Sequence, residues 1–276
     1  MLKKYNPTTP ARRGMSSPSF EEITKTTPEK SLTKRIRKNS GRNNQGRITI
    51  RHRGGGHKKV MRYVDMKQVD KLDIEGQVKA IEYDPLRSAY IMLVTYKDGE
   101  KRYHLAPEGI KVGDKIVTKV KAKAKLGSRM TLKHIPVGYQ VHNVELNPRQ
   151  GGKIARSAGT FATVVSLKGD MAQIQPSSGE VRLVQKDCFA SIGIIGNLEH
   201  SSIRVGRAGT MRWKGRRPHV LGKSMNPCDH PHGGGEGHSP IGLKHPKTPW
   251  GMPALGFKTR KRKTTDKYII KDRRHG

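Results

Sequence analysis

Hydrophobic residues are concentrated between residues 60 and 200, in short runs rich in β-branched side chains and tyrosine. Runs of this kind, bounded by turn residues, are typical of β-strands. The turn at 84–87 reads Asp-Pro-Leu-Arg, and the Lys-Asp-Gly-Glu turn at 97–100 predicts a type I′ hairpin, because Asp-Gly supplies positive φ. Five strands are predicted here, at 60–64, 76–83, 89–96, 101–105 and 115–118. Their number and spacing favour an oligonucleotide-binding (OB) barrel.

A second β module is predicted after the alternating Lys-Ala stretch at 121–125. Its pattern is similar to that of a small SH3-like barrel, with turns rich in Gly, Ser and Asp between the strands. The predicted fold class is therefore mostly β, an OB barrel followed by an SH3-like barrel. The strands of the second module are expected at 141–146, 160–167, 171–175, 180–184 and 191–195.

The two ends of the chain have a different pattern. Residues 1–59 contain four prolines and no apolar periodicity, which predicts an extended basic arm. A short helix is predicted at 207–214, ended by Gly215, and no regular element is expected beyond it, because prolines and glycines recur there. The predicted domains are 1–59 (arm), 60–125 (OB barrel), 126–200 (SH3-like barrel) and 201–276 (helix and extended basic arm).

Charge is distributed as unevenly as hydrophobicity. The 276 residues include 56 Lys and Arg against 22 Asp and Glu, a net charge of +34. Residues 1–60, 61–130, 131–200 and 201–276 carry +13, +5, +2 and +14, so the ends hold most of the excess. Mean hydropathy is −0.75, so core residues suffice for part of the chain only. Ends this cationic repel themselves, and we expect them to order against a polyanion such as nucleic acid.

Several protein classes are disfavoured by composition. No apolar run approaches the ~18 residues that would cross a bilayer, and the N-terminus lacks a secretory pattern, so a cytoplasmic protein without a membrane partner is expected. An organellar transit peptide is the alternative, because residues 1–19 partly resemble one but show no clear amphipathic helix. Cys188 and Cys228 are too few for a disulfide framework and indicate a reducing compartment.

The first basic arm closes on a glycine-rich stretch at 51–59. Three consecutive glycines carry no Cβ and let the backbone approach a partner closely, while basic side chains flank them. A backbone contact with phosphate is favoured over a flexible linker. The candidate nucleic-acid-binding residues here are Arg51, Arg53, Gly54, Gly55, Gly56, His57 and Lys58.

A histidine- and glycine-rich string at 226–238 admits several interpretations. Cys and His side chains are zinc ligands, but the spacing of Cys228, His230, His232 and His238 fits no standard zinc pair, so no metal site is predicted. His230 could act as a general base oriented by a neighbouring carboxylate, yet an extended arm supplies no walls that exclude water, so it is a weak catalytic candidate.

Recognition of nucleic acid is the interpretation we favour for this string, with a low-complexity linker as the alternative. Glycines allow close backbone approach, and imidazole and indole rings stack on unpaired bases. Basic patches on either side would neutralise phosphates, although the last could be a solvated tail. The candidates are His230, His232, Gly233, Gly234, Gly235 and Trp250, with Arg212, Trp213, Arg216, Arg217, Arg260, Lys261 and Arg262 in the flanking patches.

At these residues the chain resembles the large-subunit ribosomal protein of the universal L-two family, in its bacterial form. The resemblance covers nearly the whole chain. Two departures are Cys228, where many relatives carry an apolar residue, and His238, where relatives often have Arg. The matching strings are RHRGGGHK at 51–58, DPLRSA at 84–89, RSAG at 156–159, MNP at 225–227, DHPHGGGEG at 229–237, TPWG at 248–251 and DKYI at 266–269.

The resemblance implies a primary rRNA-binding protein of the cytoplasmic ribosome that supports subunit assembly and association, with its C-terminal arm near the peptidyl transferase centre. It implies as partners rRNA, other ribosomal proteins and the small subunit. Arg87 and Arg156 match family positions implicated in rRNA binding, and His230 matches a histidine discussed for peptide-bond formation. The implied protein is not an enzyme and carries no cofactor beyond rRNA-associated magnesium.

Two rival hypotheses remain beside a structural rRNA-binding protein. The first is a catalytic partner, which requires His230 to titrate during the reaction. The second is a general DNA-compacting protein, which would share the charge but would need neither the barrels nor the histidine-glycine string.

Overall fold

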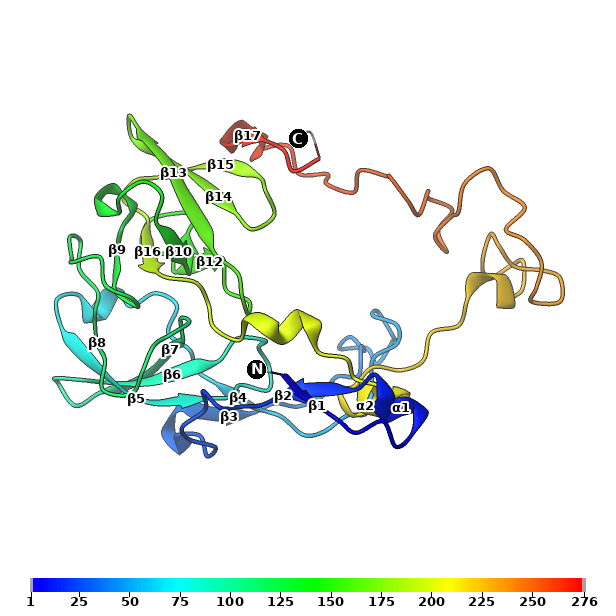
Figure 1. The fold of residues 1–276 in the computed structure, drawn as a ribbon. Coiled ribbons are helices and arrows are strands. Elements are labelled where there is room, and N and C mark those ends of the chain that lie inside the picture. Colours follow the sequence, from blue (N-terminus) through cyan, green and yellow to red (C-terminus); the bar gives the residue numbers. More distant parts are fainter. Residues whose placement is uncertain (1, 275–276) are drawn as a thin grey trace. The chain divides into compact units, whose positions relative to one another are not determined.

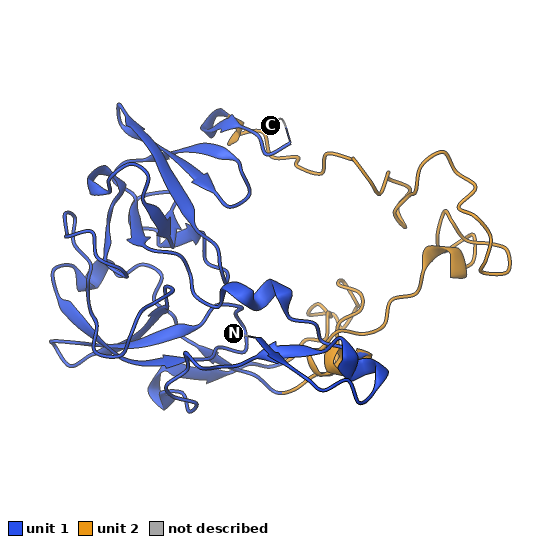
Figure 2. Cartoon of the chain, in the orientation of Figure 1, with its two compact units in different colours: residues 1–37, 58–207, 267–276 blue, residues 38–57, 208–266 orange. Residues whose placement is uncertain are grey.

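A computed structural model describes residues 2–274 of the chain and is mostly β (Figure 1), as predicted. The chain separates into two compact units (Figure 2). Unit 1 contains residues 1–37, 58–207 and 267–276, and unit 2 contains 38–57 and 208–266. None of the helices in residues 2–274 is long and apolar enough to cross a membrane.

The first module of unit 1 is an antiparallel sheet in the order β7-β6-β5-β8. Its hydrophobic side chains alternate along the strands and form two buried clusters around Val78 and Tyr103. The predicted strand at 60–64 is shorter, pairs with the N-terminal segment, and contacts β7 through a single parallel bridge from Val64 to Tyr103. The strands are β3 (Thr33–Arg35), β4 (Val60–Arg62), β5 (Glu75–Glu82), β6 (Ile91–Tyr96), β7 (Lys101–Leu105) and β8 (Lys115–Val117).

The turn between β6 and β7 lies where the sequence placed it, but the predicted type I′ geometry is wrong. Gly99 has φ +83°, whereas Asp98 is not among the residues with positive φ. The backbone N–H of Gly99 donates to the carbonyl of Tyr96 at 3.0 Å. A type I turn followed by one residue in the left-handed region forms a three-residue hairpin loop. Such a loop needs glycine at that one position only.

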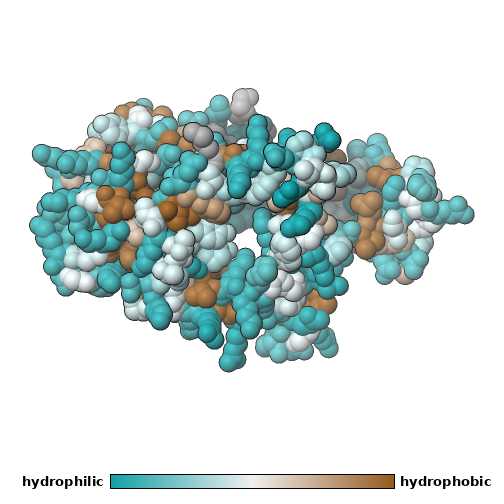
Figure 3. All heavy atoms as spheres, turned by 60° about the horizontal axis from the view of Figure 1, so that its bottom comes forward, coloured by the Kyte–Doolittle hydropathy of each residue, from teal (hydrophilic) through white to brown (hydrophobic). Residues whose placement is uncertain are grey.

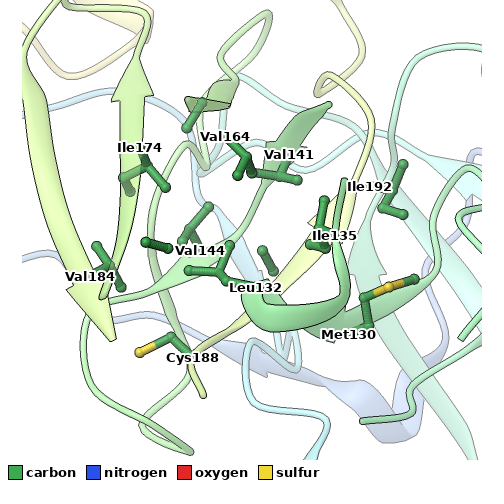
Figure 4. Close-up of a cluster of buried hydrophobic side chains, with 13 residues drawn as sticks. Met130, Leu132, Ile135, Val141, Val144, Val164, Ile174, Val184, Cys188 and Ile192 are labelled. Atoms are coloured by element: carbon green, nitrogen blue, oxygen red, sulfur yellow. The ribbon is translucent and has the colours of Figure 1, made fainter. Parts of the chain in front are cut away.

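The second module is an antiparallel sheet in the order β17-β15-β14-β13-β10-β16-β9. Its inward side chains point toward one another in a cluster that includes Val141, Val164 and Ile174, all fully buried (Figure 4). The predicted strand at 141–146 is divided at Asn143, which has φ +49°. β11 (Val144–Glu145) and β12 (Gly152–Ile154) pair with each other in a separate two-stranded sheet. The other strands are β9 (Arg129–Thr131), β10 (Gln140–His142), β13 (Ala162–Lys168), β14 (Met171–Pro176), β15 (Val181–Gln185), β16 (Phe189–Ile192) and β17 (Ile269–Lys271).

The ends contain more regular structure than the sequence predicts. The expected helix is present as α2 (Ala208–Trp213). The prediction that no regular element follows it is wrong, because β17 pairs with β15. Ile269 and Ile270 are β-branched and follow the last proline, so a short strand can form there. The N-terminal arm is also not wholly extended. Besides β3, it contains β1 (Leu2–Lys4), α1 (Pro10–Arg13) and β2 (Ser16–Pro18). The 3₁₀ turns of the chain are η1 (Lys30–Leu32), η2 (Val69–Lys71), η3 (Leu132–His134), η4 (Leu198–Ser202), η5 (Gly222–Ser224) and η6 (Asp266–Tyr268).

Unit 2 has no hydrophobic core. All of its residues are described, and His230 is the only buried one, at 7% exposure. It holds 17 Lys and Arg against three Asp and Glu, a net charge of +14. Large apolar side chains such as Trp250 and Leu255 stay exposed, at 78% and 77%. Hydrophilic side chains cover most of the face shown in Figure 3, with scattered hydrophobic patches between them.

Candidate nucleic-acid interface

Arg87 is held by the turn that precedes β6. Asp84 is fully buried, and one of its carboxylate oxygens accepts a hydrogen bond from the backbone N–H of Leu86 at 2.9 Å. The other oxygen pairs with Nη1 of Arg87 at 2.9 Å. A buried carboxylate with these two partners fixes the guanidinium, whose side chain is still 28% exposed. The remaining N–H groups of Arg87 can therefore meet a ligand.

Arg156 follows β12 on the second module and is exposed. The preceding residue, Ala155, has φ +51°, which is uncommon for alanine and costs on the order of 1–3 kcal/mol. The carbonyl of Ala155 accepts from the backbone N–H of Asn143 at 2.9 Å, which helps to hold this conformation. Nη1 of Arg156 donates to the carbonyl of Gly152 at 3.2 Å. The backbone therefore presents this guanidinium in one direction.

A buried ion pair supports the segment that leads to Arg156. Arg129 and Glu145 are both fully buried and lie 2.9 Å apart, Nη2 to Oε1. Glu145 also accepts from the backbone N–H groups of Arg149, Gly151 and Phe189 at 3.0–3.1 Å. Burial lowers the pKa of Arg129, and its pairing with Glu145 opposes that effect. The loop between β11 and β12 is thus pinned to the core of the module.

Arg87 and Arg156 line one open groove in unit 1. The two segments are joined through Ser88, whose Oγ accepts from the backbone N–H of Ala158 at 3.1 Å. The carbonyl of Ser88 accepts from Nδ2 of Asn197 at 2.6 Å. Two guanidiniums on one groove suit phosphate oxygens, because each presents a planar fork of N–H donors.

The glycine-rich stretch of unit 2 pairs with the segment that follows α2. The backbone N–H of Gly54 donates to the carbonyl of Gly215 at 3.0 Å, and that of His57 donates to the carbonyl of Trp213 at 2.9 Å. Arg53 forms an isolated antiparallel bridge with Arg216. The two predicted basic patches, one before and one after the β modules, therefore lie side by side.

The three consecutive glycines are not equivalent. A Cβ on Gly56 would lie 2.7 Å from the backbone N of Gly215 and the O of Trp213, and its φ is +82°. Gly56 is therefore needed for packing within unit 2. A Cβ on Gly55 would meet nothing within 4 Å, so this position is open toward a ligand.

Ring contacts tie residues 51–57 to the rest of unit 2. The guanidinium of Arg51 lies 5.3 Å from the ring centroid of Trp250, a cation–π distance. The imidazoles of His52 and His219 stack with centroids 3.5 Å apart. Desolvation and the adjacent His219 lower the pKa of His52. His57 and Trp213 form a tilted pair at 5.8 Å.

Trp250 lies at the tip of a hairpin that the sequence did not predict. Lys247 and Pro253 form an antiparallel bridge, and the backbone N–H of Met252 donates to Oγ1 of Thr248 at 3.2 Å. The backbone N–H of Gly251 donates to the carbonyl of Thr248 at 2.9 Å, which closes the turn. The indole is thus held on a fixed turn and remains available for stacking.

His230 organises the histidine-glycine string. Its Nδ1 accepts from the backbone N–H of His232 at 3.0 Å, and its carbonyl accepts from the backbone N–H of Gly233 at 2.8 Å. Its ring packs on Gly222, where a Cβ would come within 2.5 Å of the imidazole. Nε2 of His232 accepts from the backbone N–H of Lys247 at 2.8 Å. The string is a folded loop, and both rings are used inside it.

Two family models match the chain. The model described as the RNA binding N-terminal domain of ribosomal proteins L2 covers residues 29–118, and the C-terminal domain model covers 125–251. The chain belongs to the ribosomal protein L2 family. Members are large-subunit ribosomal proteins that bind RNA, so rRNA and ribosomal proteins are its partners and the ribosome is its location. The two β modules agree with the OB and SH3-like folds of these domains.

In this L2-family chain the remaining candidate residues lie on open surface. Arg260 is partly engaged, because its guanidinium pairs with Asp266 at 2.8 Å. No cluster of three or more His, Cys, Asp or Glu side chains suited to a metal ion occurs in residues 2–274. Gly234 and Gly235 have φ of +99° and +84°, values that favour glycine. The exposed candidates are Arg53, Lys58, Arg212, Arg216, Arg217, Lys261 and Arg262.

Proposed function

We propose that the chain is a primary rRNA-binding protein that supports assembly and association of the subunits of the cytoplasmic ribosome, with its C-terminal arm, residues 201–276, near the peptidyl transferase centre. The observation that carries this proposal is unit 2, which combines a net charge of +14 with no buried hydrophobic cluster. A segment of this kind gains too little from burial to offset the entropy of ordering. RNA supplies the missing counter-charge and surface.

The proposed interface has two parts, one that contacts phosphates and one that contacts unpaired bases. Arg87 and Arg156 sit on the two β modules of unit 1, and their remaining N–H donors suit phosphate oxygens. Trp250 and the open backbone at Gly55 suit close contacts with splayed bases and phosphates, which is how proteins recognise irregular RNA. Phosphate contacts give affinity, while stacking on unpaired bases selects the RNA structure.

The experiment is a titration of the full chain with a large-subunit rRNA fragment at several salt concentrations, with duplex DNA as competitor. We expect tight binding, a steeply negative dependence of log K on log[salt], and little displacement by DNA. Equal displacement by duplex DNA would favour the DNA-compacting hypothesis instead. Failure to bind the rRNA fragment would refute the proposal.

We propose that His230 stabilises the histidine-glycine loop and that rRNA performs peptide-bond formation. His230→Gln retains a side-chain oxygen that can accept from the backbone N–H of His232. Subunits that carry this variant are expected to assemble and to form peptide bonds at the normal rate. A rate that fell with unchanged assembly, together with a shifted pH profile, would instead show that the imidazole transfers a proton.

A role in subunit association is tested at the cationic block 260–263. Replacement of Lys261 and Arg262 by Gln leaves the Arg260–Asp266 pair intact and removes two exposed charges. Sedimentation should show assembled large subunits that join small subunits less completely. Normal joining would remove this block from the association surface.

A further inference from the structure

A groove beside β8, outside the candidate interface described above, carries a row of lysines. Its rim is formed by Lys115, Lys119, Lys121, Lys123 and Lys125, and its floor is apolar. Glu75 is its single acidic residue. All of these residues belong to unit 1, so the groove is part of the folded modules.

The loop that bears three of these lysines is anchored at both ends. Before it, Oγ1 of Thr131 donates to the carbonyl of Val120 at 2.9 Å. After it, the backbone N–H of Ser128 donates to the carbonyl of Lys125 at 3.1 Å, and that of Gly127 donates to the carbonyl of Ile192 at 3.0 Å. The loop at 121–125 is therefore a fixed part of the fold, in contrast to a solvated tail.

The Lys-Ala alternation in this loop has a structural basis. Ala122 is half-buried and packs against the hydrophobic cluster of the second module, whereas Lys121, Lys123 and Lys125 are exposed. Adjacent side chains of an extended backbone lie on opposite sides. Packing of Ala122 thus turns Lys121 and Lys123 outward, along one edge of the groove. Ala124 is exposed, and the backbone N–H of Lys125 donates to the carbonyl of Lys123 at 2.8 Å, so the chain turns there.

Lys115 and Lys119 of the row pair with Glu75 and Asp73 at 3.5 Å each. The three loop lysines differ from them, and from most basic residues of the adjoining sheet, in having no ion pair in the described part of the chain. Lys97 pairs with Glu75 at 2.9 Å, and Arg102 pairs with Asp65 at 2.7 Å. Within residues 2–274, no ion pair involves any of the three lysines of the loop. Like charges brought close on a fixed loop repel one another, and a polyanion relieves that repulsion.

We propose that this groove binds the phosphodiester backbone of a single RNA strand, as a site distinct from the Arg87–Arg156 groove and from unit 2. The lysines neutralise successive phosphates, and the floor formed by Ile116, Val117 and Ala122 accommodates the less polar ribose edges. Lysines that act as point charges bind without base preference. The inference rests on the proposed function for its partner.

The first test replaces Lys121, Lys123 and Lys125 by Ala. We expect the slope of log K against log[salt] for the rRNA fragment to become shallower by about 2, because each lost contact with single-stranded phosphate removes about 0.7. The matched control replaces Lys111, Lys133 and Lys168, three exposed lysines elsewhere in unit 1. An equal change in the control would show that only net charge matters. That result would overturn the proposal that the groove binds RNA.

A second measurement keeps the loop folded and reads contact directly. A hydroxyl-radical source is tethered to Lys123→Cys in a Cys228→Ser background, since Cys228 is exposed and Cys188 is buried. We expect cleavage of a short, continuous rRNA stretch. If a probe at Ser157→Cys beside Arg156 cleaves and the probe at position 123 does not, the groove proposal fails while the proposed function stands. If the wild-type chain does not bind the fragment, both fail.

Discussion

Arg87 and Arg156 show how intramolecular contacts orient a side chain for binding. Each guanidinium has one intramolecular partner, the buried Asp84 or the carbonyl of Gly152, and keeps further donors for a ligand. The partner fixes the direction of the side chain before RNA arrives. Less rotamer entropy is then lost on binding, which raises the affinity of each contact.

The prediction at this scale concerns loss of either guanidinium. Arg87→Lys and Arg156→Ala should each weaken binding of the rRNA fragment by about 1–3 kcal/mol, measured by filter binding. Lysine is chosen at position 87 because alanine would leave Asp84 buried and unpaired. Arg35→Ala on β3, an exposed arginine, is the control and should change affinity by less than either variant. Unchanged binding in both groove variants would contradict the assignment.

The sequence indicated Arg156 as one of the few basic residues of a nearly neutral module, and it indicated Arg87 through the family resemblance. Their placement on one groove depends on Ser88 and Ala158, which are 70 residues apart and join the two segments through a hydrogen bond. Polar residues in such roles show no periodicity and look like ordinary surface positions in a sequence. Glu145 was missed for the same reason, since a single acid within a predicted strand gives no sign that it will be fully buried.

At the scale of elements, the histidine-glycine loop is held by close backbone packing in place of a core. A Cβ on Gly233 would lie 2.2 Å from the carbonyl oxygen of Asn226, so any larger residue forces the backbone apart. The sequence identified the string as unusual and described it as an extended arm. Its fold could not be foreseen, because the contacts join backbone atoms and ring nitrogens whose pairing leaves no pattern of side chains.

We predict that Gly233→Ala disrupts this loop. Gly209→Ala is the matched control, because Gly209 lies in α2, a Cβ there meets nothing within 4 Å, and alanine favours a helix by roughly 0.5–1 kcal/mol. The Gly233 variant should lose rRNA protection by residues 222–247 in footprinting, while the Gly209 variant keeps it. Equal footprints would show that the close packing at Gly233 is dispensable.

Strands were predicted more accurately than loops. The long strands β5, β6, β13 and β14 were foreseen because each is a hydrophobic run bounded by turn residues. Three-residue strands such as β9, β12 and β17 were missed. A run of three offers too few positions for a period of two, and their pairing is decided by tertiary contacts.

At the scale of the whole molecule, the two units differ in what stabilises them. Unit 1 has buried clusters and two fully buried histidines: His104, whose Nε2 is 2.9 Å from the hydroxyl of Tyr96, and His142, whose Nδ1 donates to the carbonyl of Gly193 at 3.0 Å. Burial lowers the pKa of each to about 4. Unit 2 has no comparable interior.

These histidines make the stability of unit 1 sensitive to acid. Between pH 6.5 and 4 the unfolded chain binds protons that the folded chain does not, so the free energy of unfolding falls as the pH is lowered. The loss is on the order of 3 kcal/mol for each histidine. Urea unfolding followed by far-UV circular dichroism should show this, and His104→Gln should flatten the dependence. Constant stability from pH 7 to 4.5 would contradict it.

The central claim is that unit 2 completes its fold only against rRNA, and hydrogen exchange measures this directly. We predict that amides in the strands of unit 1 are protected both with and without a large-subunit rRNA fragment. Amides of residues 38–57 and 208–266 should exchange rapidly in the free chain and become protected on binding. Strong protection of unit 2 in the absence of RNA, or none in its presence, would contradict the account.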